Sequence, residues 1–305
     1  GVTNNGSLTA MSVTGLAAIP SVSVLASSAN TTVGMTAATT VGTADEMTIS
    51  LNGASGTAGS TITAQGIEKF TVNASGTASG ALTRPVTLTS ANTTDVTITG
   101  DAASAIAANL AGATATVQGT VTGNDAANTV ILTAAGTDKI SVNLGKGNDV
   151  LSIGTIGATH TIAGGEGTDT LASTAAITTT TGANISGFEA VSAGAVSVAL
   201  PTASNTIGAV TFTGTGGTVA GVAAGATVSQ AATGANTISN TTGWTGSSDS
   251  ISVSVGGATS TGAVTQSLTA TGIETATITN TQLSTDTTAR SVGVAGANLT
   301  KMTVV

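Results

Sequence analysis

The sequence of 305 residues contains no cysteine and no tyrosine, and it has only three phenylalanines, one tryptophan, three prolines and one histidine. The absence of cysteine excludes disulfides and thiolate metal sites. Because aromatic residues make up 1% of the chain, the core must consist of thin layers of small side chains rather than of interlocking rings. Few side chains of a catalytic type are present, and this disfavours most enzyme classes.

Charged residues are also scarce, at 7% of the chain, and acidic residues outnumber basic ones by 14 to 6. The net charge of -8 and the scattered basic residues argue against nucleic acid and anionic membrane surfaces as partners. No apolar run reaches the roughly 18 residues that a membrane helix needs, so we expect no membrane insertion. Residue 1 is Gly and no signal peptide follows it, so we expect a processed chain or a fragment of a longer protein.

Short runs in which Thr or Ser alternates with Val, Ile, Leu or Met recur along the whole chain. Such a period of two, bounded by Gly, Asn and Asp, predicts β-strands with an apolar inner face and a hydroxyl-bearing outer face. The clearest runs are residues 47–51, 69–73, 86–89, 95–99, 129–133, 140–144, 210–213, 251–255 and 275–279. One Ala-rich segment, residues 102–113, is a helix candidate with Asp101 as its N-cap.

A Gly-hydrophobe-Glu step occurs three times, and a strand-like run follows each copy. An Asp precedes the three Glu residues by 23, 20 and 25 positions, at Asp45, Asp169 and Asp249. The copies are residues 66–68, 187–189 and 272–274. A unit that recurs with loops of variable length is typical of a solenoid.

These patterns predict an all-β fold, a right-handed parallel β-helix or β-roll that runs as one continuous solenoid over residues 1–305. An array of β-sandwich domains remains the alternative, because strands connected by hairpins show the same alternation.

The most specific motif is residues 164–172, which match the nonapeptide Gly-Gly-x-Gly-x-Asp-x-hydrophobe-x of calcium-binding β-rolls. A second copy, residues 144–152, lacks only the first Gly, and weaker echoes lie at 136–140 and 123–125. Glycine permits a positive φ, so such a turn can direct several carbonyl groups at one point, and Asp adds a carboxylate oxygen. The hydrophobe of each copy is expected to face the interior.

The stretch 123–172 is therefore predicted to bind Ca²⁺. The candidate metal-site residues are Gly145, Gly147, Asp149, Gly165, Gly167, Asp169 and Asp138. Tandem copies normally follow at nine-residue steps, yet Asp149 and Asp169 are 20 residues apart and Asp138 and Asp149 are 11 apart. This spacing favours isolated ions over a continuous ladder, and the alternative is that these are tight turns that need no ion.

The nonapeptides, the Gly-Phe-Glu step at residues 187–189, the Thr-, Ala-, Gly- and Val-rich strands, the acidic balance and the lack of cysteine resemble bacterial RTX-type surface-layer (S-layer) proteins. The resemblance implies type I secretion with an uncleaved C-terminal signal. It also implies an extracellular, calcium-laden β-solenoid that assembles with copies of itself into a two-dimensional lattice on the cell surface. Anchoring to lipopolysaccharide would fall to a region outside this sequence.

Two further functional classes stay open. An RTX adhesin or a fibre segment would bind a glycan or another cell, and a secreted hydrolase would carry its catalytic domain outside this chain.

Within the chain we expect no catalytic site. His160 is the only histidine, and a lone histidine has neither the nucleophile nor the second ligand that catalysis or transition-metal binding requires. The three Glu residues of the repeat are interpreted as turn caps or calcium ligands rather than as glycosidase carboxylates. Trp244 is interpreted as a loop anchor at a subunit contact, with sugar stacking as the alternative.

Overall fold

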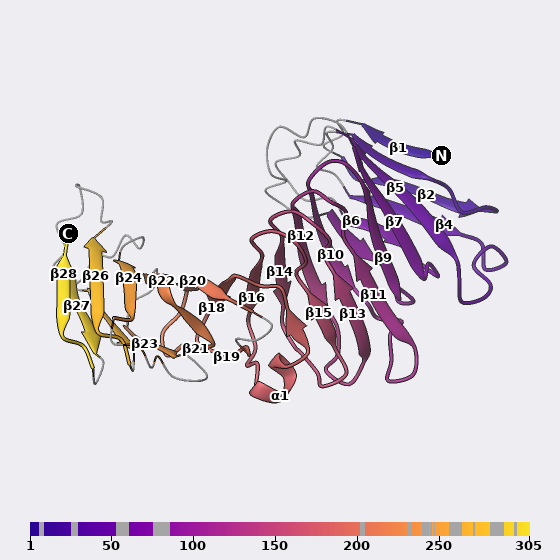
Figure 1. Cartoon of the computed structure of the whole chain (residues 1–305). Coiled ribbons are helices and arrows are strands. Elements are labelled where there is room, and N and C mark those ends of the chain that lie inside the picture. The colour runs from indigo at the N-terminus through magenta and orange to yellow at the C-terminus, as the bar shows by residue number, and fades with distance from the viewer. Residues whose placement is uncertain are drawn as a thin grey trace. The chain divides into compact units, whose positions relative to one another are not determined.

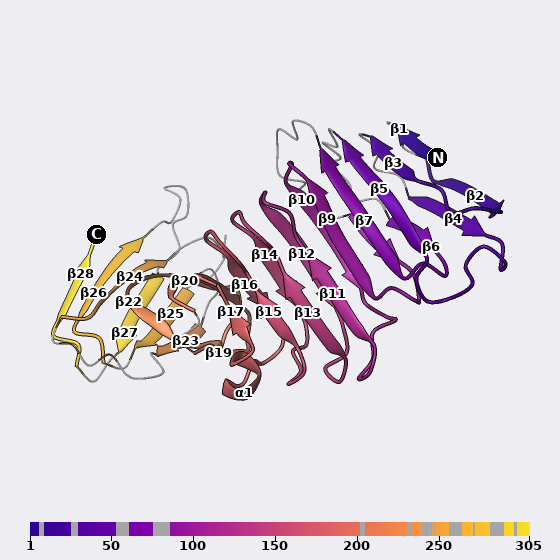
Figure 2. The same cartoon turned by 45° about the vertical axis from the view of Figure 1, so that its right-hand side comes forward.

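The computed structural model describes most of the chain as parallel β-strands wound into a solenoid (Figures 1 and 2). The described residues are 1–5, 9–25, 30–52, 61–75, 86–201, 205–230, 234–239, 244, 246, 248–255, 264–270, 272–280, 290–295 and 298–305. Strands pair in parallel with the strand two positions later in the chain. This confirms the right-handed parallel β-helix and excludes the β-sandwich array, whose strands would pair as antiparallel hairpins.

The chain divides into two compact units, residues 1–169 and 170–305. The boundary falls within the predicted calcium-binding stretch 123–172, and the single continuous segment over residues 1–305 stays a prediction. The described residues contain no helix with the length and hydrophobicity that a bilayer crossing requires.

The first unit has two parallel sheets, one of odd-numbered and one of even-numbered strands. Its strands are β1 (Val2–Asn5), β2 (Met11–Leu16), β3 (Val22–Leu25), β4 (Thr31–Met35), β5 (Glu46–Asn52), β6 (Thr61–Ala64), β7 (Lys69–Ser75), β8 (Val86–Thr89), β9 (Asp95–Gly100), β10 (Ser104–Asn109), β11 (Gln118–Thr122), β12 (Asn128–Thr133), β13 (Lys139–Asn143), β14 (Val150–Ile153) and β15 (Thr161–Ala163).

The second unit repeats this arrangement with one sheet in the order β16-β18-β20-β22-β24-β26-β28 and another in the order β19-β21-β23-β25-β27. Its elements are β16 (Thr170–Ser173), α1 (Thr179–Gly182), β17 (Ile185–Ser186), β18 (Ala190–Ala193), β19 (Ser197–Ala199), β20 (Ile207–Phe212), β21 (Thr218–Ala220), β22 (Val222–Gln230), β23 (Gly234–Ser239), β24 (Ser250–Val255), β25 (Val264–Ala270), β26 (Thr275–Asn280), β27 (Arg290–Ala295) and β28 (Lys301–Val304).

The core of the first unit consists of in-register columns of aliphatic side chains, one from each coil. Ile49 pairs with Val72 and Val72 with Ile98, and all three are almost fully buried. Each such side chain contributes roughly 1.5–3 kcal/mol of burial. All nine alternating runs of the sequence coincide with strands, so their predicted inner and outer faces are confirmed.

The predicted helix at residues 102–113 is wrong. The segment forms strand β10, in which Ile106 faces the core and pairs with Val130 of β12 and Val86 of β8. Alanine favours a helix locally, but hydrogen-bonded strands on both sides outweigh that preference.

The Gly-hydrophobe-Glu steps form corners between strands. Their glycines have φ values of 76°, 67° and 96°, and the hydrophobe of each copy, Ile67, Phe188 or Ile273, is fully buried. At two corners the Asp noted upstream lies one coil earlier at the equivalent position, because Glu46 pairs with Lys69 and Ser250 with Thr275. The spacing of 23 or 25 residues is therefore the length of one coil.

Candidate calcium site

The two nonapeptide copies form turns that stack directly on each other in successive coils. Gly147 N donates to Glu166 O at 2.9 Å, and Glu166 N donates to Gly145 O at 3.0 Å. The backbones of Lys146 and Glu166 form a parallel bridge. The offset of 20 residues is thus one coil, so the solenoid carries one motif turn per coil at this corner. We call residues 144–149 and 164–169 the acidic turns.

Glycine is required where the acidic turns touch. Gly165 and Gly167 have φ values of 119° and 140°, and Gly145 and Gly147 also have positive φ. A Cβ atom added to Gly165 would lie 1.9 Å from Gly145 O, and one added to Gly167 would lie 1.7 Å from Gly147 O. The carbonyl groups of Gly145 and Gly147 therefore point at Gly165 and Gly167, where any side chain would collide with them.

The Asp of each motif is buried, with 1% of Asp149 and none of Asp169 exposed. Asn128 N donates to Asp149 Oδ1 at 2.6 Å, and Asp149 N donates to Asp169 Oδ1 at 2.8 Å. Each carboxylate thus accepts a backbone N–H from the preceding coil. Asp149 Oδ2 is buried as well and has no hydrogen-bond partner among the described residues.

Burial raises the pKa of the Asp149 carboxyl to about 6, and the neighbouring charge of Asp169 adds to the rise. The hydrogen bonds from Asn128 act in the opposite direction and are too weak to compensate. Two adjacent buried carboxylates are costly without a counter-charge. A cation in contact with them would favour the ionised form and remove this cost.

The oxygen atoms present fit a hard cation. Ca²⁺ prefers six to eight oxygen ligands, and carboxylates and backbone carbonyls both serve. Asp149 and Asp169 would supply carboxylate oxygens, and the glycine-rich acidic turns would supply carbonyl oxygens. Among the described residues no three His, Cys, Asp or Glu side chains form a metal-binding group, so a cation bound here would need backbone carbonyl groups as further ligands. The hydrophobes that follow, Leu151 and Leu171, are fully buried as predicted.

Asp138 is not brought to this pair. It precedes β13, whereas the first acidic turn follows β13, so the length of the strand separates them. Its carboxylate accepts a hydrogen bond from Ala135 N at 2.8 Å and closes its own turn. The structure therefore places Asp149 and Asp169 together but leaves Asp138 at another corner.

Sequence reasoning missed Asn128, which holds the position of the motif Asp one coil above Asp149. Thr129 pairs with Val150, so the residues that precede them, Asn128 and Asp149, lie side by side. The only signal in the sequence was the weak echo at residues 123–125, and the shared position becomes apparent from the strand register.

The other residues that the sequence singled out, Glu68, Glu274 and Trp244, hold turns together or lie in the core. Glu68 Oε2 accepts Asp45 N at 3.0 Å and Glu274 Oε2 accepts Asp249 N at 2.8 Å, which confirms turn capping for these two. Trp244 is only 6% exposed, so its ring is buried as that of a loop anchor would be and is not available for sugar stacking. The subunit contact stays a prediction.

His160 is fully buried, and its Nε2 lies 3.2 Å from Ala135 O. Burial lowers the pKa of the imidazole and so favours its neutral form. It packs as part of the core at the corner that holds Asp138.

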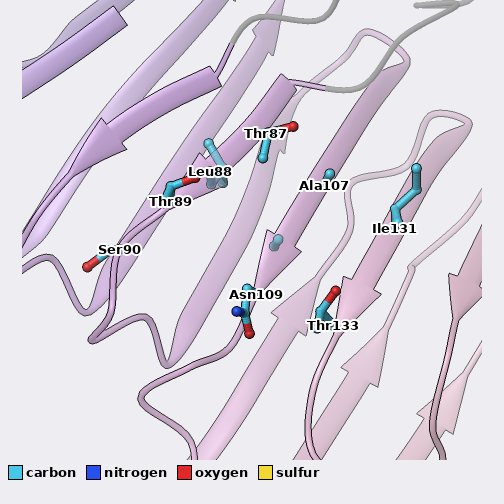
Figure 3. Close-up of a pocket in the computed structure, with 9 residues that line it drawn as sticks. Thr87, Leu88, Thr89, Ser90, Ala107, Asn109, Ile131 and Thr133 are labelled. Carbon is cyan, nitrogen blue, oxygen red and sulfur yellow. The ribbon is translucent and has the colours of Figure 1, made fainter. Parts of the chain in front are cut away.

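A shallow groove of about 180 Å³ lies on strands β8, β10 and β12, where the small side chain of Ala107 sits between Thr87 and Ile131 (Figure 3). The other lining residues are Leu88, Thr89, Ser90, Ala108, Asn109 and Thr133. The Thr, Ser and Asn side chains of this lining can donate and accept hydrogen bonds, but no lining residue titrates near neutral pH. The groove therefore offers no acid or base for catalysis.

In comparisons with known protein families, curated proteins and solved structures, no match to the chain is found. The features that bear on function are consequently the geometry of the acidic turns and the resemblance of their motifs to calcium-binding nonapeptides.

Proposed function

We propose that the chain is a structural segment of an extracellular surface layer of the RTX type, in which Ca²⁺ held by the acidic turns stabilises the solenoid. One observation carries the proposal: Asp149 is buried beside Asp169, and its Oδ2 has no partner among the described residues. Buried carboxylates of native proteins are normally paired with a cation or fully hydrogen-bonded.

The acidic turns exist only in the folded chain, because residues one coil apart supply the two carboxylates. Ca²⁺ would supply the positive charge that this oxygen cage lacks. A ligand that binds only the folded state stabilises it by about 2.7 kcal/mol when its free concentration is about 100 times Kd. Extracellular calcium modules have Kd values of roughly 10⁻⁴–10⁻³ M. The chain would accordingly remain unfolded and secretable inside the cell and would fold outside it.

Assembly with copies of itself is the second part of the proposal. The described outer faces of the sheets carry mostly Thr, Ser, Asn and Ala, and the chain has only 7% charged residues. Such faces approach one another without large electrostatic repulsion, which suits packing in a two-dimensional lattice. Anchoring to lipopolysaccharide is assigned to a region outside this sequence.

Calcium titration tests the first part. We expect calorimetric Ca²⁺ binding and a calcium-dependent rise of the thermal midpoint for the wild type, and loss of both for the double variant D149A/D169A. The matched control is Glu166→Gln, which removes an exposed acid from the same turn. A double variant that binds calcium as the wild type does would refute the site.

Electron microscopy of the purified protein tests the second part. Ordered sheets should form in calcium and disperse in EDTA. Monomers in both conditions would contradict the lattice, and isolated fibres would favour the adhesin or fibre alternative.

A further inference from the structure

The acidic turns are the lower two of four equivalent turns at one corner of the first unit. The upper two are residues 99–104 and 123–128. Ser104 pairs with Asn128 in the β10–β12 register, and Asn128 lies beside Asp149. An exposed ion pair, Lys146 Nζ to Asp125 Oδ2 at 4.0 Å, connects the second and third turns. The position of the motif Asp is thus occupied by Ser, Asn, Asp and Asp in successive coils.

An asparagine amide fills the first turn. Asn124 is 8% exposed, and its Nδ2 lies within hydrogen-bond distance of three carbonyl oxygens of that turn. These are Thr99 O at 3.4 Å, Gly100 O at 3.1 Å and Ala102 O at 3.1 Å. An amide NH₂ is a donor with partial positive charge, so it satisfies a cage of carbonyl oxygens without an ion.

A second asparagine amide fills the next turn. Asn128 is fully buried, and its Nδ2 lies 3.3 Å from Asn124 O, 2.7 Å from Ala126 O and 3.3 Å from Leu144 O. Its Oδ1 accepts the hydroxyl of Ser104 at 2.9 Å. Every polar atom of this side chain is therefore used inside the stack.

The acidic turns have the same backbone positions but lack these donors. Gly145 stands one turn below Asn124 and Gly165 two turns below it at the equivalent position, and neither carries a side chain. Asp149 stands in the place of Asn128, and an ionised carboxylate accepts hydrogen bonds but donates none. The turn of residues 144–149 thus lacks the amide NH₂ group that the carbonyl oxygens face in the turn of residues 123–128.

We infer that the amide nitrogens of Asn124 and Asn128 take the place of a cation, so that the upper two turns bind no calcium and the acidic turns require it. The residue at position 128 or 149 decides whether its turn requires calcium. With Asn, the side-chain amide of the turn donates to the carbonyl oxygens, and with Asp a cation is needed in its place. This inference rests on the proposed calcium site, and it adds that the site comprises the acidic turns and excludes the turn of residues 123–128.

The test is to convert one kind of turn into the other. N128D is expected to bind one more Ca²⁺ per chain than the wild type in calorimetry. In EDTA its thermal midpoint should fall by at least about 4 °C, and calcium should restore it. The matched control N128A removes the amide without adding a carboxylate, so its loss of stability should be equal in calcium and in EDTA.

The reciprocal exchange gives a second readout should N128D fail to fold. D149N is expected to lose calcium binding but to keep a higher thermal midpoint in EDTA than D149A, because only Asn offers an amide to the carbonyl oxygens. Equal midpoints of D149N and D149A in EDTA, or an N128D variant that behaves as N128A does, would overturn the inference and leave the calcium site intact. A wild type that binds no calcium would overturn both.

Discussion

Two kinds of corner hold successive coils together, and they use the same hydrogen bond in different surroundings. At the Gly-hydrophobe-Glu corner Glu68 accepts the backbone N–H of Asp45, and at the acidic turns Asp169 accepts that of Asp149. The first corner also buries a hydrophobe, Ile67, and leaves Asp45 half-buried. The acidic turns bury both acids against glycine. The same hydrogen bond therefore occurs beside a half-buried acid at the first corner and between two fully buried acids at the acidic turns, and we propose an ion only for the second case.

The largest effect is expected at the Gly-hydrophobe-Glu corner of residues 187–189. Phe188→Ala should reduce the free energy of unfolding by about 3–5 kcal/mol, because the ring is fully buried and its loss leaves a cavity. Denaturant unfolding should give the same loss in calcium and in EDTA. Phe188→Leu, which keeps most of the volume, should lose less, and a loss that depended on calcium would remove the distinction between the two corners.

A smaller but still large effect is expected where the acidic turns touch. Gly167→Ala forces a Cβ against Gly147 O at a φ of 140°, so we expect a loss of at least about 2 kcal/mol and weaker calcium binding. Gly42→Ala is the control, because Gly42 has a φ of 130° and open space around its Cα. Equal losses in thermal unfolding would show that backbone strain, and not the contact between turns, is responsible.

The smallest effect is expected for the hydrogen bond that Glu68 accepts at the corner of residues 66–68. Glu68→Ala removes the acceptor of Asp45 N and should cost about 1–2 kcal/mol, whereas Glu68→Gln keeps an acceptor oxygen and should cost less. Neither change should alter the calcium dependence of the thermal midpoint. If Glu68→Ala abolished part of the calcium response, this corner too would have to be regarded as an ion site.

The nine strands that coincide with alternating runs, and the hydrophobic face of each, were predictable, because a period of two is imposed by the backbone itself. The acidic pair was predictable from the nonapeptide. The equivalence of Ser104, Asn128 and Asp149 was not, because these residues are spaced by 24 and 21 positions and the register is set by strand pairing across loops of unequal length. The strand at residues 104–109 was mistaken for a helix because its neighbours in space, which decide its conformation, are distant in sequence.

The hydrogen bond from a backbone N–H to a carboxylate one coil later fixes the register of neighbouring coils, whatever the length of the coil between them. It connects Asp149 to Asp169 across 20 residues and Asp249 to Glu274 across 25. Loops on the far side of a coil can therefore lengthen or shorten while the corner remains aligned. Duplication or deletion of one whole coil is therefore expected to change the length of the solenoid while the neighbouring coils can still form this hydrogen bond.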